Sequence, residues 1–123
     1  METIKGLKRT DYCGDLNIKD CGREVTLFGW AQRQRDLGNL IFIDMRDRTG
    51  IVQLSFSDKT NRETFEKAAA VRSEYVLAVK GKVVERESKN PELPTGEIEI
   101  EVFELRIIST VSYTHLRAHE TLR

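Results

Sequence analysis

The feature that most constrains the fold is a repeated alternation of apolar and polar side chains with a period of two, which is the period of a β-strand. The alternation is most regular in GEIEIEVFELRI, residues 96–107, where Ile98, Ile100 and Val102 alternate with glutamates. A strand of this kind packs one face on a core and leaves the other face to solvent. We therefore expect a sheet protein whose strands carry separate inner and outer sets of side chains.

Four more segments have the valine, threonine and aromatic content that is typical of strands. With the segment above, the five expected strands are residues 24–34, 40–46, 51–57, 75–87 and 97–108. The DRTG turn before the third strand ends at Gly50, which can adopt the positive φ that tight hairpin turns require. Gly29, in the middle of the first strand, predicts a bulge or a sharp bend such as a barrel corner.

The segment between the third and fourth strands changes to a helical period. Phe65, Ala68 and Ala69 recur there at helical spacing, and either Thr60 or Asn61 is a suitable N-cap. Five strands with one helix between the third and the fourth is the element order of the OB-fold, a small Greek-key barrel. The predicted fold class is therefore all-β, a five-stranded OB-fold barrel with one helix.

Length, charge and cysteine content narrow the functional class. The 123 residues are enough for one domain, and apolar runs such as LIFI fall far short of the roughly 20 residues that cross a bilayer. A formal net charge of +0 argues against a strongly basic duplex-DNA binder but permits a local positive groove. Cys13 and Cys21 are isolated, so we expect free thiols and no metal site. No signal-like stretch follows the first lysines, which makes the cytoplasm the expected location.

The end of the chain, VSYTHLRAHETLR, changes character abruptly. The stretch SYTHLRAHET resembles the translation of a transposase sequencing adapter, so we expect residues 111–123 to be a tail that is not native and residues 1–110 to be the domain. Both histidines, His115 and His119, lie in this tail. We therefore expect no histidine chemistry from the domain, and we expect the native gene to continue into a longer protein.

Side chains alternate between the two faces along a strand, a property that we call parity. Parity places a set of residues on the outer face of the first three strands. If the isoleucines of LIFID point inward, Phe42 points outward and shares its side with Gln53, while Arg33 and Arg35 lie next to them. Exposed aromatic rings stack on unpaired bases, a glutamine amide matches the pairing edge of a base, and arginines bind phosphates. The pattern predicts nucleic-acid binding, with a protein-contact surface as the alternative.

Three stretches carry a resemblance to a known family. They are RTDYCGDL, the pattern G-x-x-V-T-L-x-G-W from Gly22 to Trp30, and RDLGNLIFIDMRDRTGIVQL. Together they resemble the N-terminal anticodon-binding domain of bacterial-type aspartyl-tRNA synthetases, over about Lys8 to Ser109. The resemblance implies a module that recognises the tRNA anticodon for an aspartate–tRNA ligase. A general OB-fold domain that binds single strands, and a barrel that binds only proteins, are the alternatives.

The resemblance also implies roles for individual residues. The stacking phenylalanine of the family is Phe42, and the glutamine that reads the central uracil is Gln53. The arginine that contacts the third anticodon base or its backbone is Arg35, with Arg33 as a supporting cation. The glutamate that meets the first anticodon base, a guanine, is Glu99. A carboxylate only accepts hydrogen bonds and guanine presents two adjacent donors, so this last pairing is chemically consistent.

Two loop positions complete the set of expected RNA-binding residues. Arg86 and Asn90 fall at family positions that also touch the anticodon region. Ser55 departs from the family pattern, which often has a bulky residue at that point of the third strand. A second stacking contact is therefore not carried over to this chain.

For the parent enzyme, the resemblance implies ATP-dependent aminoacylation of tRNA with aspartate by a cytoplasmic homodimer. ATP and magnesium would belong to a catalytic domain that a chain of 123 residues cannot also contain. We therefore expect neither catalytic residues nor a cofactor in this chain, and no contact with a membrane. The expected partner is the anticodon loop of aspartate tRNA.

Overall fold

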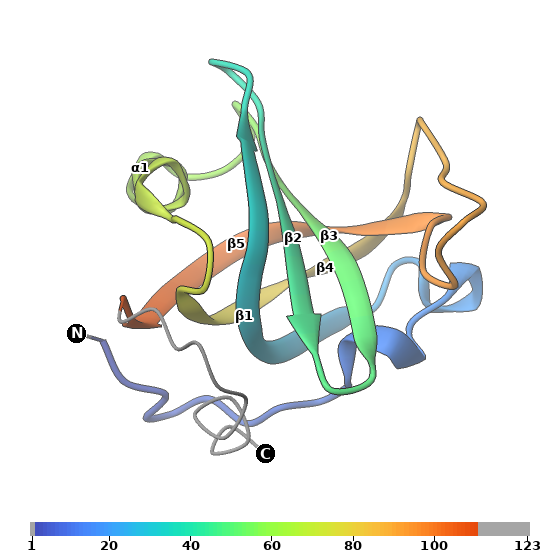
Figure 1. Ribbon diagram of the computed structural model, residues 1–123, viewed down its shortest axis with the longest axis horizontal. Helices are drawn as coiled ribbons and strands as arrows, with labels where there is room; N and C mark the ends of the chain where they lie inside the picture. The colour runs from blue at the N-terminus through green and yellow to red at the C-terminus, as the bar shows by residue number, and fades with distance from the viewer. Residues whose placement is uncertain (1, 111–123) are drawn as a thin grey trace.

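The computed structural model describes residues 2–110, which form a barrel covered at one end by a helix (Figure 1). The five strands are β1 (Glu24–Asp36), β2 (Ile41–Asp47), β3 (Gly50–Phe56), β4 (Val76–Glu85) and β5 (Ile98–Ser109). The helices are η1 (Cys13–Asp15), η2 (Ile18–Asp20) and α1 (Arg62–Ala70), of which the first two are short 3-10 helices. The expected tail, with His115 and His119, lies outside the described residues.

The strands close into a barrel in the order β1-β2-β3-β5-β4, with β4 paired back onto β1. Only the pairing between β3 and β5 is parallel among these five strands, and the helix α1 lies between β3 and β4 in the sequence. Figure 1 shows β1, β2 and β3 in front and β4 and β5 crossing behind them. The expected all-β OB-fold barrel is confirmed.

The alternation in the sequence corresponds to the inside and the outside of this barrel. On β5, Ile98, Ile100 and Val102 are buried, as expected from their spacing. On β2, Ile41 and Ile43 have no exposed surface. The residues between them on the same strands keep part of their surface exposed, so side-chain parity holds on both strands.

Strand β1 turns the corner of the barrel near Gly29, but the bulge lies elsewhere. The register of β1 against β2 shifts between Ala31 and Arg33, so the bulge, one of the two alternatives that we expected at Gly29, is at Gln32, and Gly29 has the other, the bend. Gly29 instead sits where β1 leaves β4 and begins to pair with β2. A Cβ at this position would overlap the carbonyl oxygen of Arg46, so glycine is needed here for close approach of two backbones.

The helix α1 begins after Asn61, whose side-chain oxygen accepts a hydrogen bond from the backbone N–H of Thr64 at 2.9 Å. This is the expected N-cap. Ala68 is buried in the core, and Phe65 and Ala69 pack against it, so the predicted apolar face is confirmed. Within residues 2–110, no helix is long and apolar enough to cross a membrane.

The N-terminal segment closes the other end of the barrel, an arrangement that sequence patterning did not predict. In η1 the backbone N–H of Cys13 donates to a carboxylate oxygen of Asp47 at 2.8 Å, and the N–H of Gly14 donates to the hydroxyl of Thr49 at 2.8 Å. These bonds fasten η1 to the turn between β2 and β3. Cys13 is buried and Cys21 is exposed, both as free thiols.

Candidate nucleic-acid interface

The outer face of the barrel carries two neighbouring rows of polar and aromatic side chains that cross four strands. Strand register defines the rows, because directly paired residues point to the same face of a sheet. The first row runs from β1 to β5 through Arg33, Asp44, Gln53 and Glu99. The second row runs through Arg35, Phe42, Ser55 and Glu101. Five of the seven predicted RNA-binding residues therefore lie in two adjacent rows.

Phe42 lies on this outer face, between two isoleucines that are fully buried, and its side chain is half-buried. The guanidinium carbon of Arg35 lies 5.1 Å from the centroid of its ring, within the range of a cation–π contact. The ring is thus held in place from one side by an arginine. It remains outside the barrel core, as parity predicts.

Gln53 differs from the expectation of a solvent-exposed amide. Its register places it on the outer face, but only 6% of its surface is exposed. Nη2 of Arg35 donates to its Oε1 at 3.0 Å, and its Nε2 donates to Oε1 of Glu99 at 2.8 Å. The amide is therefore held at both ends by hydrogen-bond partners, an arrangement that parity alone does not predict because it depends on long side chains from β1 and β5.

Glu99 is half-buried and uses one carboxylate oxygen to hold the Gln53 amide. No described residue donates a hydrogen bond to its other oxygen, Oε2. A carboxylate offers about four acceptor positions, so Glu99 retains the capacity to bind a group with two adjacent donors. The arrangement places an acceptor-only group at one end of the first row and a donor-only group, Arg33, at the other.

Arg86 and Asn90 are placed differently from the other predicted residues. The backbone N–H of Arg86 donates to the carbonyl of Glu97 just beyond the paired residues of β4 and β5, so Arg86 lies beside the Glu99 end of the first row. Its Nε is buried without a hydrogen-bond partner among the described residues. The Asn90 side chain instead accepts from the N–H of Glu92 at 3.0 Å and shapes its own loop. Neither side chain bonds to Gln53.

Three members of the rows were not predicted as site residues, namely Asp44, Ser55 and Glu101. Asp44 is half-buried between Arg33 and Gln53, and it shares the outward parity of Phe42, which is the signal that could have found it. Ser55 is buried, and its hydroxyl donates to the carbonyl of Ile100 at 3.4 Å. A small residue at position 55 leaves the space next to Phe42 without a second ring.

A second basic and aromatic cluster surrounds Tyr12, near the turn between β2 and β3. The guanidinium carbons of Arg9 and Arg48 lie 4.3 Å and 4.8 Å from the Tyr12 ring centroid. Both arginines also donate to the Tyr12 hydroxyl, and the bond from Arg48 is the largest cause of its lowered pKa. Composition and parity did not predict this cluster, because Arg48 is far from Tyr12 in the sequence.

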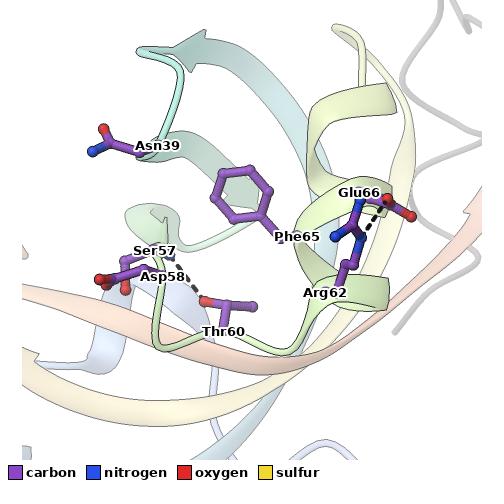
Figure 2. A pocket seen from close by; sticks show the side chains of 7 residues that line it. All are labelled: Asn39, Ser57, Asp58, Thr60, Arg62, Phe65 and Glu66. Atoms are coloured by element: carbon purple, nitrogen blue, oxygen red, sulfur yellow. Dashed lines mark hydrogen bonds and ion pairs between the residues drawn. The ribbon is translucent and has the colours of Figure 1, made fainter.

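The described residues also form an open pocket of 630 Å³ between the β1–β2 turn and the start of α1. Figure 2 shows the Phe65 ring pointing into it toward Asn39, and Arg62 paired with Glu66 on its helical side. None of the seven predicted RNA-binding residues lines this pocket. It is therefore separate from the two rows.

Comparison with known families agrees with this geometry. A family model named for the tRNA anticodon, and described as an OB-fold nucleic acid binding domain, matches residues 25–108. The chain belongs to this family. Membership in this family supports the interpretation that the domain binds an anticodon. It favours this interpretation over that of a general OB-fold domain that binds single strands.

Similar proteins point to one group within this family. The chain is 56% identical over 110 residues to aspartate–tRNA(Asp/Asn) ligase from Caldanaerobacter subterraneus subsp. tengcongensis, a match that covers 88% of this chain and 19% of the relative. It is 51% identical over 108 residues to aspartate–tRNA ligase from Clostridium tetani, with 88% of this chain and 18% of the relative covered. The anticodon-family domain thus spans about a fifth of the length of these relatives.

Solved structures show the same fold within larger enzymes. Asparaginyl-tRNA synthetase from Pyrococcus horikoshii matches with a TM-score of 0.71 and 33% identity over 86% of this chain and 24% of that chain. Aspartyl tRNA synthetase from Entamoeba histolytica matches with a TM-score of 0.76 and 22% identity over 90% of this chain and 23% of that chain. At this lower identity, the second likeness shows the fold alone.

Proposed function

We propose that this domain is the anticodon-recognition module of an aspartate–tRNA ligase, and that it binds the anticodon loop of aspartate tRNA on the two outer rows. One observation carries the proposal. A ring, an amide and a carboxylate from β2, β3 and β5, namely Phe42, Gln53 and Glu99, lie together on one face, and Arg35 contacts the first two. This is the set of groups needed to stack one base and to bind the edges of two others.

In this proposal Phe42 stacks on an anticodon base, and Gln53 binds the pairing edge of the central uracil. The Phe42 side chain is only half-buried, so part of it is available to a base beside the Arg35 contact. An amide offers a donor next to an acceptor, which matches the N3–H and the carbonyl oxygens of uracil. These two contacts would supply stacking energy and base identity from adjacent rows.

Glu99 and the arginines would recognise the two outer positions of the anticodon. Glu99 binds the first base, a guanine, through the carboxylate capacity that Gln53 leaves free. Arg35 contacts the third base or its backbone, and Arg33 supports it as an exposed cation at the end of the first row. This division explains why an acidic side chain lies on a surface meant for a polyanion.

Arg86 and Asn90 are proposed as contacts at the edge of the anticodon loop. Arg86 lies beside the Glu99 end of the first row, and its buried Nε has no hydrogen-bond partner within residues 2–110. Asn90 belongs to the loop between β4 and β5, where its amide nitrogen is available in addition to the oxygen that shapes the loop. Their contribution would be positional, because neither side chain joins the Gln53 network.

The remaining properties of the parent enzyme are also proposals. We assign ATP-dependent aminoacylation with aspartate, with its ATP and magnesium, to a catalytic domain outside this chain, in a cytoplasmic homodimer. Among the described residues, no group of three or more His, Cys, Asp or Glu side chains could hold a metal ion. The role of residues 2–110 would be to bind tRNA.

Binding of anticodon stem-loop RNAs to the whole chain tests this function. We expect an RNA with the anticodon GUC to bind more tightly than one whose central uracil is replaced, because Gln53 then loses a matching edge. The two RNAs have the same number of phosphates, so the non-specific electrostatic contribution is matched. Equal, salt-sensitive binding would instead indicate a general single-strand binder. Absence of binding to both would indicate a protein-contact barrel.

A further inference from the structure

The side-chain amide of Gln53 is held at both ends by partners of opposite hydrogen-bonding character. Nη2 of Arg35 donates to Oε1 at 3.0 Å, and Oε1 of Glu99 accepts from Nε2 at 2.8 Å. A guanidinium can only donate and an ionised carboxylate can only accept. The oxygen of the amide must therefore face Arg35 and the nitrogen must face Glu99.

Rotation of this amide by 180° would break both bonds at once. The flipped amide would turn its N–H groups toward the Arg35 guanidinium and its oxygen toward the Glu99 carboxylate, which pairs donor with donor and acceptor with acceptor. Because Gln53 is only 6% exposed, water has little access to compensate for the lost bonds. The direction of the amide along the first row, which we call its polarity, is thus fixed before any RNA binds.

The two partners occupy only half of the hydrogen-bonding capacity of the amide. A glutamine side chain has two N–H donors and two lone pairs on its oxygen. One donor is used by Glu99 and one lone pair by Arg35, so one N–H and one lone pair remain. An amide presents such a pair along one edge, where it can make two parallel hydrogen bonds to the edge of a base.

Uracil and cytosine present matching pairs of groups in opposite order. Next to each other on the pairing edge, uracil has a donor at N3 and an acceptor at O4, whereas cytosine has an acceptor at N3 and a donor at N4. An amide that can flip satisfies either base at the same ring position. An amide of fixed polarity satisfies only one of them there and meets the other with donor against donor.

We infer that Arg35 and Glu99 are positioning residues that fix the polarity of the Gln53 amide, and that this polarity selects uracil over cytosine at the central anticodon position. The inference rests on the proposed function and deepens it, since it names how the amide distinguishes two bases of the same size. The strand framework supports it. Arg35 comes from β1, Gln53 from β3 and Glu99 from β5, so the barrel itself holds both partners at fixed positions.

The test is the ratio of two affinities, for stem-loop RNAs with uracil and with cytosine at the central anticodon position. Arg35→Gln replaces a side chain that can only donate hydrogen bonds, and Glu99→Gln replaces one that can only accept them. The new side chain in each case is an amide, which both donates and accepts. In the double variant nothing fixes the polarity, and we expect the uracil-to-cytosine ratio to fall by about tenfold, the effect of two neutral hydrogen bonds. The double swap Arg35→Glu with Glu99→Arg reverses the polarity, so we expect the ratio to turn in favour of cytosine.

A matched control separates positioning from direct contact with RNA. Arg33→Gln removes an arginine from the same strand and the same face, two residues away, and its side chain is not bonded to Gln53. We expect it to weaken binding of both RNAs equally and to leave the ratio unchanged. An unchanged ratio in the double variant would overturn the inference while the proposed function stands. If the unsubstituted chain binds neither RNA, both are rejected.

A second measurement reports on the polarity without RNA. We expect the side-chain N–H of Gln53 that donates to Glu99 to show slow hydrogen exchange in NMR spectra of the unsubstituted chain, because it is buried and bonded to a carboxylate. The double Arg35→Gln and Glu99→Gln variant should lose this protection while backbone protection in β3 stays the same. Equal protection of the side chain in both proteins would contradict a polarity fixed by these two residues.

Discussion

The guanidinium of Arg35 lies over the ring of Phe42, with 5.1 Å between the guanidinium carbon and the ring centroid. The two residues are directly paired across β1 and β2, so the contact follows from strand register. The same arginine reaches Gln53 on β3. One side chain therefore organises both the stacking surface and the amide of the proposed interface, and it holds them in place before RNA arrives.

Replacement of Phe42 by alanine tests the stacking role. We expect Phe42→Ala to weaken binding of the GUC stem-loop by about 1–3 kcal/mol, because a base loses its aromatic partner. Phe103→Ala is the matched control, since Phe103 is a phenylalanine with 41% of its surface exposed and lies outside the two rows. Isothermal titration of both variants would measure the difference. Equal affinity of Phe42→Ala and the unsubstituted chain would show that no base stacks on this ring.

Substitution of Glu99 by glutamine tests recognition of the first anticodon base. The carboxylate accepts from both donors of guanine, whereas an amide turns one donor toward them, so Glu99→Gln should reduce the preference for guanine over adenine by about 1–3 kcal/mol. Competition between stem-loops that differ only at this base measures the preference. Glu101→Gln, two residues along the same strand and in the second row, should retain it. A Glu99→Gln variant that still selects guanine as strongly as before would exclude the assigned contact.

The sequence predicted the strands and the faces of the barrel because these depend on local periodicity. Ile98, Ile100 and Val102 alternate with polar residues whatever their distant neighbours are, and their burial follows. The burial of Gln53 was not predictable in this way, since it results from side chains that reach across from β1 and β5. The position of the bulge at Gln32 depends in the same way on how β1 is shared between β4 and β2.

The attachment of the N-terminal segment was not predictable for a related reason. Short 3-10 helices such as η1 have no apolar period to detect, and their hydrogen bonds join residues that are far apart in the sequence. In the sequence, Asp47 stands between Arg46 and Arg48, and this charged stretch does not indicate a buried partner for it. In the structure it is buried and binds the backbone of Cys13, so its role is internal.

The buried thiol of Cys13 gives the stability of the domain a pH dependence of defined sign. Burial is the largest cause of its raised pKa, and the neighbouring Asp47 carboxylate adds to it. The unfolded chain therefore releases the thiol proton at a lower pH than the folded domain does. The contribution of this group to the free energy of unfolding is complete below the ordinary thiol pKa of 9.0 and decreases as the pH rises above it.

Urea unfolding of Cys13→Ala and the unsubstituted chain, under reducing conditions from pH 7 upward, would measure this effect. We expect the stability advantage of Cys13 over alanine to shrink above the thiol pKa by up to about 1.4 kcal/mol for each pH unit. Cys21→Ala is the matched control for removal of a thiol, because Cys21 is exposed whereas Cys13 is buried. A constant advantage for Cys13 across the alkaline range would contradict a raised thiol pKa.

Asp47 fastens the N-terminal segment to the β2–β3 turn, and its removal should destabilise the fold. Its carboxylate accepts from the N–H of Cys13 at 2.8 Å, and from the N–H and the hydroxyl of Thr49 at 2.8 Å and 2.6 Å. Asp47→Ala leaves these donors without an acceptor in a buried place, so we expect a loss of about 2–4 kcal/mol in the free energy of unfolding. Urea denaturation provides the measurement, and Asp44→Ala, a half-buried aspartate on the same strand, is the comparison. Hydrogen exchange distinguishes a local effect from a global one, because the N–H of Cys13 should lose protection first. An Asp47→Ala variant that keeps both this protection and its stability would show that the hydrogen bonds of Asp47 contribute nothing to the fold.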